Sequence, residues 1–382
     1  MYASRMSNLP PYLFARIDEM KAEQRKLGVD LIDLGVGDPD LATPPHIVEA
    51  LCTAAKDSKN HHYPDYAGMP AYRSAVAGWY KKRFGVTLDA GKEVVALMGS
   101  KDGIAHIAEA FVNPGDYVLS PSPGYPVYRT GTLFAEGRVH DMPLLRENNF
   151  LPVLSAIPEK VAKAAKILYI NYPNNPTGAI APDGFYKEVV DFADEHDIVV
   201  VSDNAYSEVS FDGYRAPSFL QTKGAMEVGI EMHSLSKTYN MTGWRIGMAV
   251  GNADVIAGLG RVKTNVDSGV FDAVQHAAIT ALSGSQDCVQ DACNIYQERR
   301  NVLCSGLKEL GFDVPVPKAT FYVWVPAKDC IEFSGRLLTE AGIVATPGVG
   351  FGASGDGYVR FAITRPVARI QEAIERMRGM KP

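Results

Sequence analysis

The sequence contains few cysteines and no long apolar segment, and each absence excludes a class of protein. Its 382 residues include five cysteines, which are scattered and form no Cys-x-x-Cys pair, and its eight histidines show no ligand-like spacing with cysteines or carboxylates. We therefore expect reduced thiols, a cytoplasmic protein and no metal site. No run of about 18 apolar residues is present and no apolar segment follows the first methionine, so we expect neither a membrane span nor a signal peptide.

An excess of positive charge is also absent. The formal net charge of −6 argues against a nucleic-acid-binding surface, although local basic pockets for small anions are compatible with it. The chain is 46% hydrophobic and 21% charged, which is the composition of an ordinary globular protein. Because 382 residues exceed what one compact core usually covers, we expect two subdomains.

Short apolar runs alternate with amphipathic stretches of helical length, a pattern typical of an α/β fold with a mostly parallel sheet. The near-continuous apolar run at 198–201 is typical of a strand that is buried on both faces. We predict strands over 93–98, 117–119, 167–170, 198–201, 230–233 and 247–250. We predict helices over 71–84, 103–111, 184–196 and 253–262.

The pattern changes from Gln286 onward, where long helices and short strands indicate an α+β subdomain. A helix over 13–27 and a strand over 31–34 are its expected N-terminal partners. We predict an N-terminal arm and part of the small domain in 1–40, a contiguous large domain in 41–284, and the rest of the small domain in 285–382. Within the last segment we predict helices over 288–310, 332–341 and 368–380 and strands over 321–325 and 358–363.

Lys237 lies between hydroxyl residues in the segment 234–245, and Arg245 follows eight residues later. A lysine amine can form a Schiff base with an aldehyde, and hydroxyls together with a guanidinium can hold a phosphate dianion. Pyridoxal 5′-phosphate (PLP) carries both groups. A solvated lysine on a surface turn would explain the segment equally well if it stood alone.

Other polar residues follow predicted strands, and ligands bind at the carboxyl ends of strands in open parallel sheets. Ser100 opens a helix, Asn175 lies in a Pro-Gly-rich turn and Asp203 ends a buried strand; helix caps and turns explain each of them separately. PLP needs an anion clamp, a carboxylate for its pyridine nitrogen, a hydroxyl for its phenolic oxygen and a stacking aromatic ring. The residues that meet these needs together are, in chain order, Ser100, Tyr125, Asn175, Asp203, Tyr206, Ser234, Lys237 and Arg245.

The chain resembles the fold-type I, class I aminotransferases over nearly its whole length, from Leu34 to Phe361. The segments that carry the resemblance are 8–14, 99–106, 171–178, 234–245 and 265–271. Within that family the chain looks most like the bacterial branch that acts on LL-diaminopimelate. The resemblance implies the PLP-dependent transferase fold type I: a large domain with a mostly parallel seven-stranded sheet between helices, and a smaller α+β domain built from both chain ends.

The resemblance also implies a role for each cofactor residue. Lys237 would bind PLP covalently and later carry the proton, Asp203 would keep the pyridine nitrogen protonated, and Tyr125 would stack on the ring. Tyr63 matches the tyrosine that reaches the phosphate of the partner subunit, which implies a homodimer with the active site at the subunit interface. The full set of implied cofactor residues is Tyr63, Ser100, Lys101, Tyr125, Asn175, Asp203, Tyr206, Ser234, Ser236, Lys237 and Arg245.

The implied substrates are small molecules, namely amino acids and 2-oxo acids. Arg360 matches the arginine that clamps the substrate α-carboxylate, for which a bidentate guanidinium is well suited. The full set of implied substrate contacts is Tyr12, Gly37, Lys101, Tyr125, Asn175, Asn265 and Arg360, and Tyr66 and Asp267 are further candidates for the distal end of the substrate. His106, Trp244 and Phe351 are interpreted as structural residues.

The reaction that the resemblance implies is amino transfer between LL-diaminopimelate and 2-oxoglutarate. In the biosynthetic direction glutamate would aminate tetrahydrodipicolinate in lysine biosynthesis. Two alternatives share the cofactor residues and stay open at this point: an alanine or broad-specificity aminotransferase of the same family, and a PLP-dependent C–S β-lyase.

Overall fold

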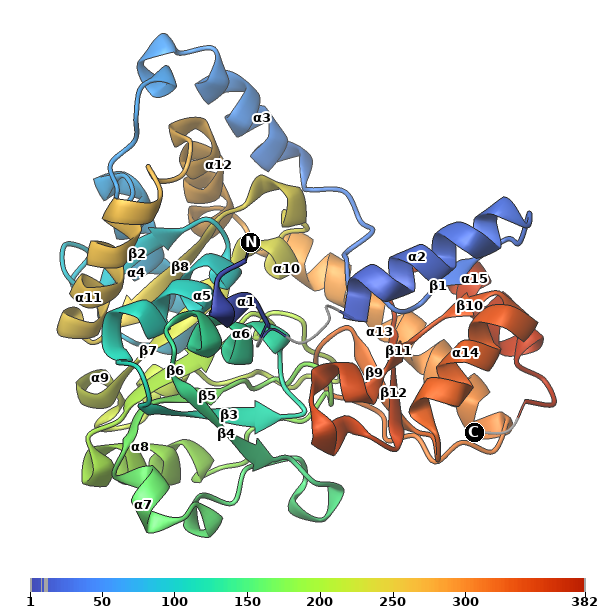
Figure 1. Cartoon of the computed structure of the whole chain (residues 1–382). Coiled ribbons are helices and arrows are strands. Elements are labelled where there is room, and N and C mark those ends of the chain that lie inside the picture. The colour runs from blue at the N-terminus through green and yellow to red at the C-terminus, as the bar shows by residue number, and fades with distance from the viewer. Residues whose placement is uncertain (1, 8, 10–12, 381–382) are drawn as a thin grey trace.

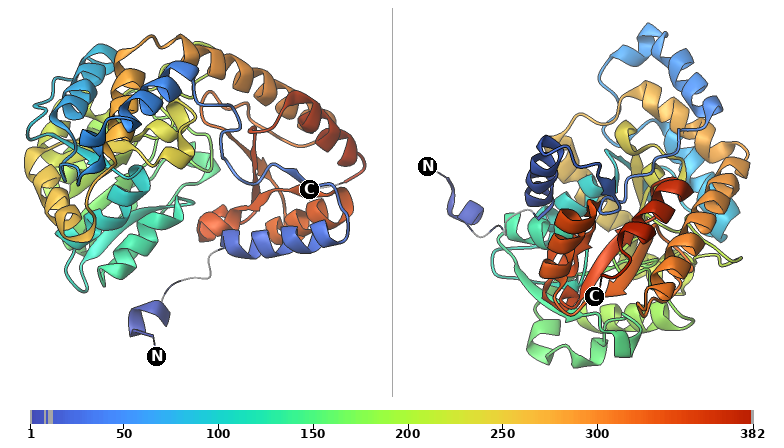
Figure 2. Two further views of the ribbon diagram at one scale, coloured as in Figure 1. Left: turned by 90° about the horizontal axis from the view of Figure 1, so that it is seen from above. Right: turned by 90° about the vertical axis from the view of Figure 1, so that its right-hand side faces the viewer.

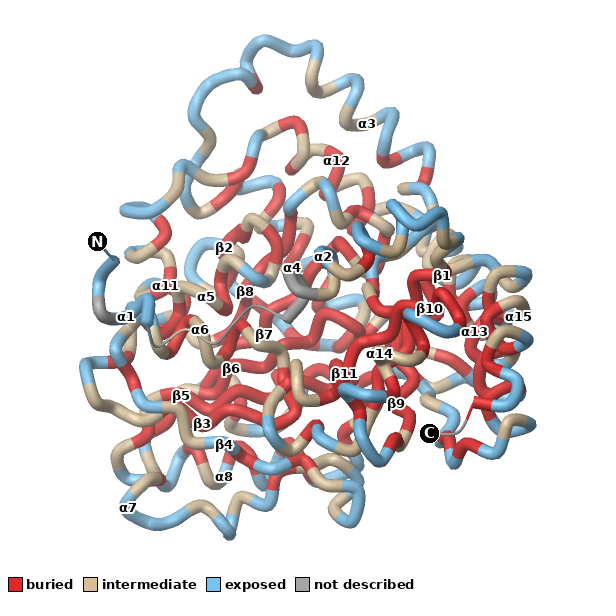
Figure 3. Tube along the Cα trace, turned by 45° about the vertical axis from the view of Figure 1, so that its right-hand side comes forward, coloured by how far each residue is buried: buried red, intermediate tan, exposed pale blue. Residues whose placement is uncertain are grey.

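A computed structural model of the chain describes residues 2–7, 9 and 13–380. Figure 1 shows two parts side by side, a larger one with helices around a central sheet and a smaller one formed mainly by the C-terminal segment from Asp287 onward. The buried residues follow the strands of both parts, and the exposed residues lie on the outer helices and loops (Figure 3). No helix in the described ranges combines the length and the apolar character that crossing a membrane requires.

The large part is built on a seven-stranded sheet, which confirms the expected α/β fold. Its strand order is β2-β8-β7-β6-β5-β3-β4. The central strands pair in parallel, and only β8 runs against its two neighbours. The strands are β2 (Val94–Leu97), β3 (Tyr117–Ser122), β4 (Arg138–Pro143), β5 (Ala165–Ile170), β6 (Val199–Asp203), β7 (Gly229–Ser234) and β8 (Gly247–Gly251).

The six strands predicted for this sheet are present, but β4 was missed. It lies at the edge of the sheet and pairs only with β3. Its residues are largely exposed or half-buried, and Met142 is its only buried side chain. An edge strand needs no continuous apolar run, and charged side chains are common there. The apolar signal that identified the other strands is therefore absent from β4.

Helices cover both faces of the large sheet. On one face α5 (Ser100–Phe111), α6 (Pro126–Phe134) and α11 (Ala253–Val266) pack on Leu97, Ile230 and Met232. On the other face α4 (Pro70–Phe84), α8 (Phe185–His196) and α12 (Asp272–Ser283) pack on Ala96 and Val200. The remaining helices of this part are α3 (Pro45–Ala55), α7 (Glu159–Ala162), α9 (Ala225–Val228) and α10 (Leu235–Thr238). Successive side chains of a strand point to opposite faces, which explains the two separate apolar layers.

The smaller part brings the two ends of the chain together. Strand β1 (Ile32–Asp33) pairs in parallel with β10 (Ile343–Val344), and Ile32 belongs to the same apolar core as Ile370. A three-stranded antiparallel sheet follows the order β11-β12-β9, with β9 (Tyr322–Pro326), β11 (Thr346–Pro347) and β12 (Tyr358–Ala362). Its helices are α2 (Leu13–Lys26), α13 (Asp287–Glu309), α14 (Cys330–Ala341) and α15 (Val367–Arg376), and the short α1 (Ser4–Ser7) precedes them.

The long helix α13 runs from the helices of the large sheet to the smaller part (Figure 2, left). The expectation that both chain ends build the smaller part is thus confirmed by the β1–β10 pairing. The exact boundaries after residues 40 and 284 stay a prediction.

Candidate active site

A cavity of about 450 Å³ lies where several strands of the large sheet end, against the smaller part. Most of the residues predicted for the site line it: Gly37, Ser100, Lys101, Tyr125, Asn175, Asp203, Tyr206, Ser234, Ser236, Lys237, Arg245 and Arg360. Asp203, Ser234 and Arg360 lie on strands β6, β7 and β12, and the other predicted residues lie in loops and helices, so both parts of the molecule contribute to one place. This is the position at which open parallel sheets bind their ligands.

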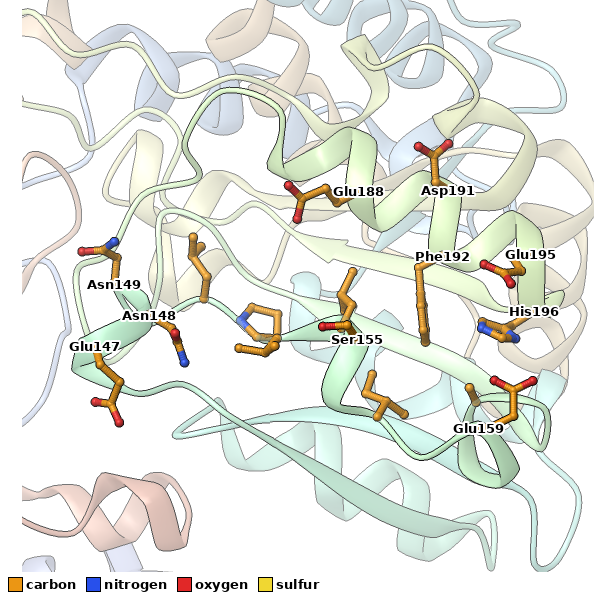
Figure 4. Close-up of a pocket in the computed structure, with 16 residues that line it drawn as sticks. Glu147, Asn148, Asn149, Ser155, Glu159, Glu188, Asp191, Phe192, Glu195 and His196 are labelled. Atoms are coloured by element: carbon orange, nitrogen blue, oxygen red, sulfur yellow. The ribbon is translucent and has the colours of Figure 1, made fainter.

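Larger cavities, of about 750, 680 and 500 Å³, lie elsewhere in the described structure, and the smallest of these also shares no lining residue with the 450 Å³ cavity. The first, of about 750 Å³, is lined by carboxylates that include Glu188, Asp191 and Glu195 around an apolar floor (Figure 4). Its lining includes neither lysine nor arginine, so it offers no amine for a Schiff base and no guanidinium for a phosphate or a carboxylate. The second, of about 680 Å³, shares no lining residue with the predicted site. The chemistry of the linings, and not the size, identifies the 450 Å³ cavity as the candidate site.

Lys237 lies on α10, which begins directly after strand β7. The Ser234 side chain caps this short helix by accepting a hydrogen bond from the Ser236 amide at 3.2 Å. The half-buried Lys237 donates a hydrogen bond from Nζ to the Gly37 carbonyl at 2.9 Å. Burial lowers the pKa of Lys237 to about 8; Asp38 opposes this shift, and Arg360 and Arg245 add to it. A lysine with this pKa is partly neutral near pH 8 and can act as a nucleophile or a base.

Asp203 ends strand β6 and is buried. One carboxylate oxygen, Oδ2, accepts a hydrogen bond from the Tyr128 hydroxyl at 2.7 Å, and the other, Oδ1, has no partner in the described structure. Burial raises the pKa of Asp203 to about 6, while the Tyr128 bond and the Ala205 amide oppose the shift. A buried oxygen without a partner is costly in free energy. It is therefore suited to accept a hydrogen bond from a cationic ligand nitrogen.

The start of α5 and the loop after Lys237 form an anion-binding corner. Gly99 has a φ of 78°, and a Cβ there would lie within 2.9 Å of Arg245 Cζ, so only glycine lets the arginine approach. Arg245 donates to the Thr242 carbonyl at 2.8 Å, which orients its guanidinium. The buried Ser236 hydroxyl has no partner among the described residues. A helix start, a guanidinium and a hydroxyl without a partner together suit a phosphate dianion.

Arg360 on β12 is buried and held on several sides. Its Nη1 donates to Asn175 Oδ1 at 2.8 Å, and its Nη2 donates to the Gly35 carbonyl at 2.7 Å. The guanidinium carbon lies 4.1 Å from the ring centre of Tyr322 and 4.6 Å from that of Phe351. Two aromatic rings and two hydrogen bonds therefore fix the plane of this cation at the cavity wall.

Several residues of the cavity were not predicted from the sequence. The Tyr322 hydroxyl forms a 2.8 Å hydrogen bond with the Tyr206 hydroxyl, and a Cβ at Gly37 would overlap the Tyr322 ring. Phe351, interpreted as structural, also lines the cavity against Arg360. Tyr128 does not line the cavity but donates a hydrogen bond to Asp203. Asp18 and Asp38 are charged residues of the lining that were not predicted.

Five predicted residues lie apart from the cavity or outside the described structure, and two of them are Tyr66 and Asp267, the further candidates for the distal end of the substrate. Tyr63 is 88% exposed and Asn265 is exposed, and neither lines the cavity. Tyr12 lies outside the described residues. Tyr66, Val266 and Phe271 are also exposed apolar side chains. Within the described ranges, no three His, Cys, Asp or Glu side chains come together as a metal site.

Comparison with known proteins gives a family match and close relatives over the full length of the chain. The model of the family "Aminotransferase class I and II" matches residues 29–377. The LL-diaminopimelate aminotransferase of Syntrophobacter fumaroxidans is 58% identical over 381 residues, which cover 99% of this chain and 98% of the relative. The enzyme of the same name from Aquifex aeolicus is 54% identical, with 100% and 99% covered.

The solved structures agree with this match. The substrate-bound BacF structure from Bacillus subtilis has a TM-score of 0.96 at 38% identity and covers 100% of this chain and 98% of its own. The aspartate aminotransferase of Thermus thermophilus with maleate has a TM-score of 0.91 at 31% identity, with 99% and 98% covered.

Proposed function

This chain belongs to the class I and II aminotransferases, and from that premise we propose that it transfers an amino group between LL-diaminopimelate and 2-oxoglutarate with PLP as its cofactor. In the biosynthetic direction glutamate would aminate tetrahydrodipicolinate, a step of lysine biosynthesis. The geometric observation that carries the proposal is the convergence of Lys237, Asp203 and Arg360 on one cavity. Relatives that share 50–58% of their residues with this chain over the full length support the substrate.

The chemical groups of the residues that line the cavity match those that PLP needs. The unpartnered Asp203 Oδ1 suits the pyridine N–H, and the unpartnered Ser236 hydroxyl suits the phosphate. Ser100, Lys101, Ser234 and Arg245 would hold the remaining phosphate oxygens. When bound, PLP supplies an electron sink for the negative charge that develops at the substrate Cα.

Lys237 has the central role in the proposed reaction. Its amine would hold the cofactor aldehyde and, once released by the substrate, would remove the proton from the substrate Cα. A base near pH 8 must be partly neutral, and the lowered pKa of about 8 meets this condition. The Gly37 carbonyl accepts a hydrogen bond from the amine and so limits the directions in which it can point.

Asp203 and Arg360 would fix the two ends of the reacting unit. Above a pH of about 6 Asp203 is ionised, so it can keep a proton on the pyridine nitrogen. Arg360 would bind the substrate α-carboxylate with its planar guanidinium. Its partner Asn175, together with Tyr206, would contact the phenolic oxygen, and Tyr125 would stack on the ring. The hydrogen bond between Arg360 and Asn175 would thus connect the residue that binds the substrate carboxylate to a residue that binds the cofactor oxygen.

We propose a homodimer with the active site at the subunit interface. Tyr63, Tyr66, Val266 and Phe271 are exposed apolar side chains, and a second copy of the chain would cover them. Tyr63 would then reach the phosphate held by the partner subunit, and Asn265 would approach substrate only in the dimer. The five free thiols support a reducing location such as the cytoplasm.

The distal end of diaminopimelate carries an ammonium and a carboxylate, and both need partners. Lys101 is exposed and lines the cavity, so it suits the distal carboxylate. Gly37 lines the same cavity and packs directly against the Tyr322 ring. Tyr12 and Asn265 are the further residues proposed for this end.

Comparative kinetics test the proposal. The purified protein with PLP is assayed with LL-diaminopimelate, alanine and aspartate as donors to 2-oxoglutarate, and with cystathionine for pyruvate release. We expect kcat/KM for LL-diaminopimelate to exceed the values for the other donors by about 100-fold or more, because a distal ammonium and carboxylate add two charge-assisted contacts. A higher kcat/KM for alanine or aspartate, or pyruvate release from cystathionine as the main activity, would overturn it.

A further inference from the structure

A buried ion cluster lies beside the start of α5, outside the residues that line the candidate cavity. Lys263 on α11 is 1% exposed, and its Nζ pairs with Asp102 on α5 and, at 2.8 Å, with Asp267 Oδ2. The two carboxylates are nearly as buried as the lysine. Because removing one partner leaves the others buried without compensation, a change at Lys263 is expected to act on both carboxylates.

Asp102 connects this cluster to the anion-binding corner. It lies two residues after Ser100, and its Oδ2 also accepts a hydrogen bond from the Met98 amide at 2.9 Å. Its Oδ1 pairs with His106 Nδ1 at 2.8 Å. The carboxylate thus braces the turn between β2 and α5 that carries Ser100 and Lys101 into the cavity.

The negative charge of Asp102 is unfavourable at this place unless it is compensated. A carboxylate in the first turn stabilises a helix, but it repels a phosphate dianion that binds at the same helix end. In a buried setting the repulsion between such charges is strong. Lys263 supplies the opposite charge from the neighbouring helix α11.

Asp267 extends the cluster toward the segment after Tyr63. Its Oδ1 accepts a hydrogen bond from the Gly269 amide at 2.7 Å. Gly269 has a φ of 86°, and a Cβ there would lie 3.1 Å from the Asp65 carbonyl oxygen, so the two loops are in close contact. The same lysine therefore supports both the phosphate-binding start of α5 and the loop that borders Tyr63.

We infer that Lys263 is a positioning residue for the cofactor phosphate, which offsets the charge of Asp102 and ties the start of α5 to the loop at Asp267. The inference rests on the proposed function, since it requires that a phosphate binds at Ser100 and Arg245. It makes Lys263 necessary for the affinity of the protein for a phosphorylated cofactor, and unnecessary for binding the pyridine ring itself.

The test compares two cofactor forms in the Lys263→Met variant. The cofactor-free protein is titrated with PLP and with pyridoxal, which has the same ring and aldehyde but no phosphate, and binding is followed by absorbance. We expect the Kd for PLP to rise about tenfold or more, as for loss of a charge-assisted contact, and the Kd for pyridoxal to change by less than about threefold. An unchanged Kd for PLP, or equal losses for both compounds, would overturn the inference.

Two further variants separate positioning from a general loss of stability. Arg300→Met removes a cation that is as buried as Lys263 and is paired with Asp212 at 2.6 Å, but Arg300 does not line the cavity. The Kd of this variant for PLP should stay within about threefold of the wild-type value. Lys263→Met/Asp102→Asn removes both charges of the pair and should recover most of the lost PLP affinity. If Lys263→Met does not fold, the double variant and Asp102→Asn alone still test the inference. A loss of PLP affinity above tenfold in Asp102→Asn would contradict the claim that Lys263 compensates the charge of Asp102.

The wild-type protein distinguishes the two levels of failure. If wild type binds no PLP, the proposed function fails and the inference with it. If wild type binds PLP through Lys237 and Lys263→Met binds it equally well, only the inference fails.

Discussion

The Tyr128 hydroxyl donates a hydrogen bond to Asp203 Oδ2 at 2.7 Å and leaves Oδ1 of the same carboxylate without a partner in the described structure. Tyr128 is itself buried and stacks on Tyr169 with ring centres 4.7 Å apart. The carboxylate is therefore held in one orientation by a rigid neighbour, with one oxygen left for a ligand. Such a fixed, half-satisfied acceptor is what a protonated pyridine nitrogen requires.

Removing this support should change the pH profile of the enzyme. Burial raises the pKa of Asp203 to about 6 and the Tyr128 bond opposes the shift, so Tyr128→Phe raises the pKa further. We expect the acid limb of kcat/KM to move to higher pH and kcat/KM at pH 7 to fall about tenfold. Tyr169→Phe is the control, because the Tyr169 hydroxyl donates its hydrogen bond to the Ile104 carbonyl and not to Asp203. This variant should keep the acid limb of kcat/KM at the wild-type pH. A limb that does not move in Tyr128→Phe would contradict the role of Asp203.

The charge of the half-buried Lys237 should destabilise the cofactor-free protein. Its pKa falls from 10.5 to about 8 because of burial, so the unfolded chain binds the proton more tightly than the folded one. The penalty is full below pH 8, decreases as the pH rises from 8 to 10.5, and is absent above that range. Lys237→Met should therefore raise the free energy of unfolding of the cofactor-free protein at pH 7 by on the order of 3 kcal/mol at most.

Denaturant unfolding of the cofactor-free protein at pH 7 and near pH 10.5 measures this effect. The gain in Lys237→Met should be large at the lower pH and vanish at the higher one. Lys160→Met, at an exposed lysine, should show no such difference. A gain independent of pH would mean that the side chain, and not its charge, is the cause.

Arg360→Lys should separate substrate binding from cofactor binding. A lysine cannot reproduce a planar guanidinium between the rings of Tyr322 and Phe351, or its two hydrogen bonds. We expect kcat/KM for both amino acid and 2-oxo acid to fall about 100-fold, with an unchanged Kd for PLP. The matched variant Arg245→Lys should weaken PLP binding first. The assignment of the two arginines would be wrong if these effects were exchanged.

Gly37 should tolerate no side chain. A Cβ at this position would overlap the Tyr322 ring, and the Gly37 carbonyl accepts the hydrogen bond from Lys237. Gly37→Ala should therefore lower kcat/KM about tenfold or more, because Tyr322 or the residue-37 backbone has to move. Gly78→Ala on α4, where nothing lies within 4 Å of the new Cβ, is the control and should leave kcat/KM unchanged. Equal kcat/KM values for the two variants would contradict the close contact.

The fold was predicted well wherever a strand is buried on both faces. The segments at β5 and β6 contain nearly continuous apolar runs, and the structure places them in the centre of the sheet. Strand β4 has no such run because it lies at an edge and is largely exposed. The strands were therefore predicted from the apolar runs that burial on both faces requires, and not from strand propensity alone.

The site was predicted where its residues belong to local segments. Ser234, Ser236, Lys237 and Arg245 lie within twelve residues of sequence, and the structure brings all of them to the cavity. Tyr322 was missed because its contact with Tyr206 joins positions 116 residues apart, which no local pattern reports. Tyr63 and Asn265 do not reach the cavity within one chain, so their proposed roles depend on a second subunit.

The most direct test of the central claim is the Lys237→Ala variant, mixed with PLP and then with LL-diaminopimelate under single-turnover conditions. Wild type should show the absorbance of a lysine-bound cofactor, lose it on addition of LL-diaminopimelate, and release one equivalent of the 2-oxo product per active site. Lys237→Ala should show neither the lysine-bound absorbance nor product release above about a thousandth of the wild-type rate. A variant that keeps both the absorbance and the amino transfer would contradict the account.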